Sequence, residues 1–198
     1  MEQFSVRIIK YPHPTLRRRS RDLRRVDAEL RKIVAEMLDL MYAHKGVGLA
    51  ANQVDLPYRL FVINPSGDPA AKDQQFVFIN PVISRQTGTA EADEGCLSFP
   101  EIYAPVKRAE RVALSAYNLA GEELQYELDG FFARAVQHEY DHLEGKLFID
   151  RLSPSNLAEI RPALDELVEQ FEGDRQRGVI PADPQIVARL EELEKLRT

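Results

Sequence analysis

The stretch QHEYDHLEG, Gln137–Gly145, carries two histidines and a glutamate in the spacing His-Glu-x-x-His. On a helix, His138 and His142 lie about 400° apart around the axis, so both imidazoles project from one face. They can then bind one cation, and Glu139 can reach the site as an acid or base without being a ligand. The alternative is a polar helix with two surface histidines. Because the chain has only four histidines, finding two of them here favours the metal site.

The sequence after this helix supplies no clear third ligand. One class of zinc peptidase requires a further histidine at a position that Phe148 occupies in this chain. Another class takes a glutamate further downstream. Candidates exist at Glu159, Glu166 and Glu169, but each is equally well explained as a solvated residue on a helix surface. The third ligand is therefore sought upstream.

The stretch EGCLSFP, residues 94–100, contains the only cysteine, Cys96. A thiolate is a soft, strong ligand for divalent transition metals. One cysteine and two histidines leave one position of a tetrahedral site open for water. The alternative is a small buried hydrophobic residue, which is the commonest fate of a free cysteine.

A third stretch, GVGLAANQ, covers residues 46–53. It lacks the Gly-Lys-Ser/Thr of a phosphate-binding loop. Two glycines and two alanines suit a tight wall beside a ligand, and Gln53 can donate an amide hydrogen bond to a developing oxyanion. The alternative is a turn that ends a helix and leaves Gln53 in solvent.

Residue patterns elsewhere predict an α+β fold rather than alternating βαβ units. Asp27 is the expected N-cap of a helix that ends near Gly46. From about Phe131 the pattern is helical again, residues 172–183 have the composition of a linker, and Asp183 is expected to cap a last helix. The first helix has an apolar stripe at Leu30, Ile33, Val34, Met37 and Met41, the last at Ile186, Val187, Leu190 and Leu193, and strands are predicted near residues 59–65, 75–83, 111–118 and 123–128.

Bulk properties point to one cytoplasmic domain, with or without an appendage. The chain has 198 residues and a formal net charge of −6, so it has no global basic surface for nucleic acid. A single cysteine excludes an internal disulfide and fits a reducing compartment. No segment approaches the ~20 apolar residues that cross a bilayer, and MEQFSVRIIKYPHP at the N-terminus lacks the apolar run of a signal peptide.

Taken together and in this order, GVGLAANQ, EGCLSFP and QHEYDHLEG closely resemble the three signature motifs of the peptide deformylase family. The resemblance runs from residue 7 to residue 154, about three quarters of the chain. It implies an enzyme that removes the N-formyl group from the initiator methionine of new polypeptides. It also implies antiparallel β-sheets packed around the His-Glu-x-x-His helix, with a catalytic domain at 1–155 and a C-terminal helical extension at 156–198.

The resemblance also assigns roles to residues of the three motifs. It implies that Glu139 is the general acid and base, and that Gln53 and the backbone N–H of Leu97 bind the formyl oxygen. Some members have an arginine near the position of Tyr103, where it grips the peptide backbone. By the same resemblance the metal ligands are Cys96, His138 and His142, and the substrate groove and methionine pocket are lined by Val47, Gly48, Gly95, Arg134 and Ala135.

The implied cofactor is one divalent metal ion. The family typically uses Fe(II), and zinc or nickel can occupy the site in a purified protein; ligand preference alone does not separate them. The implied partners are N-formylmethionyl nascent peptides and, transiently, the ribosome, with no membrane and no sequence-specific nucleic acid. The basic cluster LRRRSRDLRR, residues 16–25, is interpreted as a solvated turn in preference to a contact with ribosomal RNA.

Two questions stay open at this level. Arg108 either pairs with Glu94 and braces the cysteine loop, or the pair is exposed or absent. The rivals to a deformylase are a peptidase that uses the same helix motif, and a catalytically silent peptide-binding or metal-storage relative. Phe148 and the cysteine loop argue against the peptidase, and intact Glu139, Gln53 and Cys96 argue against the silent relative.

Overall fold

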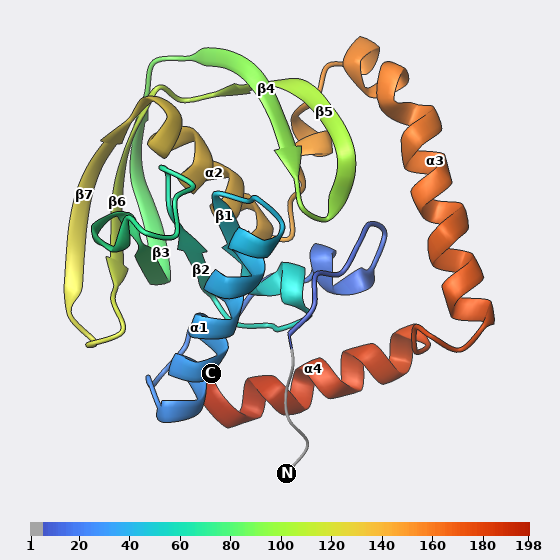
Figure 1. The fold of residues 1–198 in the computed structure, drawn as a ribbon, viewed down its shortest axis with the longest axis horizontal. Coiled ribbons are helices and arrows are strands. Elements are labelled where there is room, and N and C mark those ends of the chain that lie inside the picture. Colours follow the sequence, from blue (N-terminus) through green and yellow to red (C-terminus); the bar gives the residue numbers. More distant parts are fainter. Residues whose placement is uncertain (1–5) are drawn as a thin grey trace.

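A five-stranded antiparallel sheet in the order β1-β2-β3-β6-β7 and a separate hairpin, β4–β5, form the β part of the molecule (Figure 1). The structure is a computed structural model and describes residues 6–198. Sheets and helices together make the α+β fold that the sequence predicts. The strands are β1 (Gly48–Ala50), β2 (Leu60–Ile63), β3 (Phe76–Thr87), β4 (Ala90–Cys96), β5 (Phe99–Arg108), β6 (Arg111–Tyr117) and β7 (Glu123–Asp129); the helices are α1 (Ala28–Ala43), α2 (Gly130–Leu143), α3 (Pro154–Gln176) and α4 (Asp183–Arg197).

The first helix, α1, matches its prediction in both its cap and its buried face. The Asp27 carboxylate accepts a hydrogen bond from the Leu30 amide at 2.8 Å, which satisfies one of the free N–H groups at the helix start. The helix ends at Ala43, and Lys45 follows with a left-handed φ of 56°. The whole predicted stripe is buried against strands β1 and β2: Leu30, Ile33, Val34, Met37 and Met41.

Helix α2 lies between the five-stranded sheet and the β4–β5 hairpin. Its apolar side, with Ala133, Val136 and Leu143, packs on the sheet around Phe61 and Phe78. Its polar side faces the hairpin region, and residues 133–139 are all buried. The helix with the His-Glu-x-x-His motif is therefore central, as the sequence predicts, and its histidines point into the molecule rather than into solvent.

The sequence predicts only part of the β4–β5 hairpin: Ser98 and Pro100 indicate a strand that ends in a loop near Cys96, whereas β5 is not predicted. β4 has the sequence AEADEGC, which is mostly polar, and β5 contains Pro100 and Pro105, which weaken a strand assignment. In a two-stranded sheet each strand has an unpaired edge, so prolines can be accommodated. Along β5 the buried side chains alternate as Ile102, Ala104, Val106 and Arg108, which places Arg108 on the inner face.

The C-terminal helices run around the body and return to it. α3 passes along one side, and α4 turns back so that the C-terminus lies near α1 (Figure 1). The predicted linker at 172–183 is wrong in its first part, because α3 continues through Gln176. Two local contacts stabilise this last part of α3: Arg175 stacks on the ring of Phe171 at 4.7 Å, and Arg177 pairs with Asp174.

Helix α4 packs with three of its four predicted apolar residues. Ile186 and Leu190 are buried, and Leu193 contacts the core around α1, whereas Val187 is 37% exposed. The helix begins at Asp183 itself, with Ala182 as N-cap. Within residues 6–198, no helix has both the length and the apolar character needed to cross a membrane.

Candidate metal centre and active site

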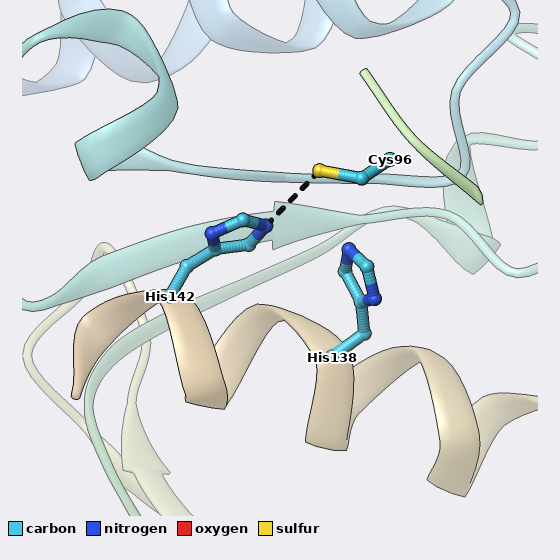
Figure 2. A group of neighbouring side chains, drawn as sticks. All are labelled: Cys96, His138 and His142. Carbon is cyan, nitrogen blue, oxygen red and sulfur yellow. Dashed lines mark hydrogen bonds between the residues drawn. The ribbon is translucent and has the colours of Figure 1, made fainter. Parts of the chain in front are cut away.

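Three side chains converge at the centre of the molecule (Figure 2). Cys96 at the end of β4 faces the two imidazoles that project from α2. Its Sγ lies 3.3 Å from Nε2 of His142, although the two residues are 46 positions apart in sequence. One ligand atom from each of Cys96, His138 and His142 lies within 4.8 Å of the others. The structure thus brings together the three residues that the sequence singles out.

This donor set fits a divalent transition metal. Metal bonds of ~2.0–2.3 Å place the ligand atoms of a tetrahedral site about 3.3–3.8 Å apart. The 3.3 Å between Cys96 Sγ and His142 Nε2 falls in this range. Nδ1 of the buried His142 has no hydrogen-bond partner among residues 6–198. A thiolate and two imidazoles suit zinc, iron or nickel better than calcium or magnesium, which prefer oxygen.

Glu94 holds His138 in the orientation that a ligand needs. Its Oε2 lies 3.0 Å from Nδ1 of His138, so an N–H there donates to the carboxylate and Nε2 is left to face Cys96. Two arginines grip the same carboxylate. Arg108 donates to both oxygens at 2.9 and 2.8 Å, and Arg134 donates to Oε1 at 2.7 Å.

The pair of Glu94 and Arg108 is buried and belongs to a larger network. Both side chains are at most 5% exposed. Arg108 also contacts the Asp141 carboxylate, and Arg151 donates to Asp141 at 2.5 and 2.6 Å. The structure therefore decides the question that the sequence leaves open, in favour of a bracing pair. The alternation along β5, which sends an arginine to a buried face, is the sequence signal that points to it.

Glu139 is buried beside the histidines without being one of the three clustered ligands. It is 4% exposed, and its Oε2 has no hydrogen-bond partner within the described part of the chain. Gly48 lies against the carboxylate, and a Cβ at this position would collide with it. A carboxylate that is buried, close to a candidate metal and free to accept a proton is suited to acid–base chemistry.

The environment separates the pKa values of the four ionisable groups. Burial raises the pKa of Glu139 to about 7. Burial acts in the same direction on Glu94, but hydrogen bonds from Arg108 and His138 outweigh it and hold its pKa well below the usual range. Burial lowers the pKa of His138, but hydrogen bonds with Cys96 and Glu94 raise it to about 10; a metal bound at Nε2 would displace this proton. Burial and the adjacent His138 lower the pKa of His142, so this imidazole is neutral, the form that binds a metal.

The side chain of Gln53 is buried beside Cys96. It is 1% exposed, which rules out the solvated turn. Its Oε1 accepts a hydrogen bond from the Ala50 amide at 2.8 Å, and this fixes which way the side-chain amide points. Its Nε2 then lies 3.3 Å from Sγ of Cys96 and 3.4 Å from Oγ of Ser98. Ser98 is a partner that the sequence does not reveal.

A cavity of about 820 Å³ opens from this centre to the surface. Arg134 contributes to its wall, but its guanidinium is already occupied by Glu94 and by the carbonyls of Ala90 and Val106. Tyr103, which is 67% exposed, lies across Gly95 at the cavity mouth, where a Cβ on the glycine would overlap the ring. Every residue that the sequence assigns to substrate binding or to the formyl oxygen lines the cavity: Val47, Gly48, Gln53, Gly95, Leu97, Arg134 and Ala135.

Comparison with known proteins identifies the family. The family profile described as polypeptide deformylase matches residues 5–158. The chain belongs to the polypeptide deformylase family. A curated peptide deformylase of Rhodopirellula baltica is 46% identical over 191 residues, which cover 96% of this chain and 94% of that protein. A curated peptide deformylase of Acinetobacter baumannii is 42% identical over 169 residues, which cover 85% of this chain and 94% of that protein.

Solved structures of deformylases share the fold. A plant peptide deformylase superimposes with a TM-score of 0.84 at 38% identity, covering 92% of this chain and 98% of that one. The Plasmodium falciparum peptide deformylase has a TM-score of 0.82 at 39% identity, covering 84% and 98%. The α+β assignment is thereby confirmed, including the match to deformylase structures.

Membership of the deformylase family establishes the reaction class. The chain is a hydrolase that removes the N-formyl group from newly synthesised polypeptides, a metal-dependent reaction in this family. The peptidase rival is excluded, because the match covers the part of the chain that contains all three motifs. The group Cys96, His138 and His142 is the candidate site for the metal.

Proposed function

We propose that the cavity around Cys96, His138 and His142 is the deformylase active site, with these three residues as metal ligands and Glu139 as the acid and base. The observation that carries this proposal is the position of Cys96 Sγ, 3.3 Å from His142 Nε2, at the end of a cavity whose wall includes the buried Glu139. When bound, the metal supplies a Lewis acid that makes water nucleophilic near neutral pH.

Glu139 moves the proton in both halves of the reaction. Its carboxylate accepts a proton from water as the water oxygen forms a bond to the formyl carbon. It then delivers that proton to the amide nitrogen as the carbon–nitrogen bond breaks, so formate and a free amino terminus leave. Its pKa of about 7 fits a group that both accepts and donates a proton near neutrality.

Gln53 and the backbone N–H of Leu97 stabilise the negative charge that develops on the formyl oxygen. The Gln53 amide is preorganised, since Ala50 holds its oxygen and turns its NH₂ group toward Cys96. A donor fixed in this way contributes about 3 kcal/mol in comparable sites. The methionine side chain lies in the part of the cavity lined by Gly95, Arg134 and Ala135, where the aliphatic stem of Arg134 supplies apolar surface.

The metal, compartment and partners complete the proposal. Fe(II) is the native ion, and zinc or nickel can occupy the same site in purified protein. The chain works in the cytoplasm on N-formylmethionyl nascent peptides and meets the ribosome transiently. Residues 1–155 form the catalytic domain and 156–198 a helical extension. Ion pairs within the chain support a structural role for the basic cluster rather than a nucleic-acid site: Arg17–Asp150, Arg18–Glu194, Arg19–Glu144 and Arg25–Asp27.

Formate release from formyl-Met-Ala-Ser tests the function. Purified protein loaded with Fe(II) under anaerobic conditions is expected to release formate, a chelator to abolish release, and added Fe(II), Ni(II) or Zn(II) to restore it to different extents. A silent peptide-binding or metal-storage relative would retain metal and release no formate. Absence of formate with all three metals would therefore overturn the proposal.

Cys96→Ser is expected to weaken metal binding strongly. The hydroxyl of serine is a poorer ligand than a thiolate for these ions, while its size and hydrogen-bonding capacity are similar. The expected result is loss of most of the bound metal after dialysis, measured by elemental analysis, with the folded structure retained. Unchanged metal content would exclude the thiolate as a ligand. Ser84→Ala, at an exposed position of β3, is a control that should keep its metal.

A further inference from the structure

The C-terminal helix α4 touches the turn that carries Gln53. This turn, Ala51–Val54, is a single 3₁₀ turn between β1 and β2, and it ends at Asp55. Arg189 of α4 donates to the carbonyl of Asp55 at 2.9 Å and lies 2.5 Å from its carboxylate, although the two residues are 134 positions apart. A segment outside the three motifs thus reaches Asp55, the residue at which the turn Ala51–Val54 ends; because this turn carries Gln53, we call it the oxyanion turn.

Asp55 has a backbone conformation that needs support. Its φ and ψ are 62° and 35°, the left-handed region that residues other than glycine rarely adopt. Such conformations persist when surrounding contacts hold them. Besides Arg189, the Thr15 hydroxyl donates to the Asp55 carboxylate at 2.5 Å, and the amide of Asp55 donates to Asn52 at 3.2 Å.

The position of Gln53 depends on this turn. Two backbone N–H groups hold Gln53. The Ala50 amide donates to its side-chain oxygen, and the Ile9 amide donates to its backbone carbonyl at 2.9 Å. Because Ala50 and Gln53 belong to the same short segment, a shift of the turn moves the amide and its anchor together. The NH₂ group would then move relative to Cys96, which is held separately on β4.

Helix α4 is itself firmly attached, so it can act as a support. Leu190, the neighbour of Arg189, is 1% exposed, and Glu194 accepts two hydrogen bonds from Arg18 at 2.8 and 2.9 Å. The Arg189 side chain is 37% exposed, however, and ion pairs of this kind contribute little to overall stability. Its contact therefore affects the local geometry of the turn more than the unfolding equilibrium.

We propose that Arg189 is a positioning residue: through its contacts with Asp55, helix α4 holds the oxyanion turn in place. The C-terminal extension is then part of the catalytic unit rather than an appendage. This inference rests on the proposed role of Gln53. It adds that the position of Gln53 depends on Arg189, a residue far outside the three motifs.

The first test is Arg189→Met in the full-length, metal-loaded protein. The expected result is a fall in kcat of about tenfold, part of the 10²–10³ that loss of an oxyanion donor costs, with KM, metal content and melting temperature unchanged. Arg189→Lys keeps a cation and should recover part of the loss. The control is Arg177→Met, which removes an exposed ion pair with Asp174 on the same extension and should leave kcat unchanged.

A double-mutant cycle with Asp55→Gly tests the mechanism. Glycine adopts the left-handed conformation without support, so Arg189→Met in this background should change kcat by less than about twofold. An equal loss in both backgrounds, or no loss in the native background, would overturn the inference. The assay also includes Gln53→Leu. If Gln53→Leu lowers kcat and Arg189→Met does not, this inference alone fails; if native protein releases no formate, the proposed function fails.

Discussion

Glu139→Gln is expected to lower kcat for deformylation by about 10²–10⁴-fold, the usual contribution of a general acid and base. Glutamine has the same shape, so it preserves the packing against Gly48, but its amide cannot accept and return a proton. Glu139 is not one of the three clustered ligands, so metal content should be unchanged. Formate release and elemental analysis on the same sample measure both quantities, and Glu139→Ala should behave alike.

The matched control is Glu169→Gln, which makes the same chemical change at an exposed position of α3. It should retain native kcat and native metal content. A Glu139→Gln enzyme with full activity would remove Glu139 from the mechanism. Loss of metal in that variant would instead show that Glu139 is a ligand, which would contradict the assignment of three ligands.

Arg108→Met is expected to reduce the free energy of unfolding by about 3 kcal/mol, near the lower limit for breaking a buried ion pair. Two carboxylates, Glu94 and Asp141, lose a partner at sites where each is 5% exposed. The loss stays near this limit because Arg134 still holds Glu94 and Arg151 still holds Asp141. For a chain of this length the melting temperature should fall by roughly 6–12 °C, measured by calorimetry or circular dichroism.

The same change should weaken metal binding. Glu94 orients His138, and loss of an outer partner of a metal ligand typically costs 10–100-fold in affinity. Competition with a chelator measures this effect at a temperature at which the variant is folded. The control is Arg85→Met, because Arg85 pairs with Glu127 on the surface and should contribute less than about 1 kcal/mol. Equal stability of the two variants would show that the buried network does not stabilise the fold.

Local patterns predicted the elements whose determinants lie close together in the chain. The N-cap at Asp27 and the stripe of α1 require only neighbouring residues and a period of 3.6, and the structure has both. Patterns failed where distant contacts override local preference. The β4–β5 hairpin forms despite two prolines. In α3 the pattern failed for a different reason: the linker-like composition outweighed a local contact, between Arg175 and Phe171 four residues apart on the helix, that the structure shows.

The sequence by itself determined the chemistry of the candidate site. The spacing of His138, Glu139 and His142 on one helix and the presence of a single cysteine specify which groups can act, because both are local or compositional facts. Only the tertiary structure decided how those groups are arranged. The distance from Cys96 to His142, the burial of Glu94 with Arg108, and the contact of Arg189 with Asp55 join residues 46, 14 and 134 positions apart. Such contacts depend on how helices and strands pack against one another, and a local sequence pattern does not contain that information.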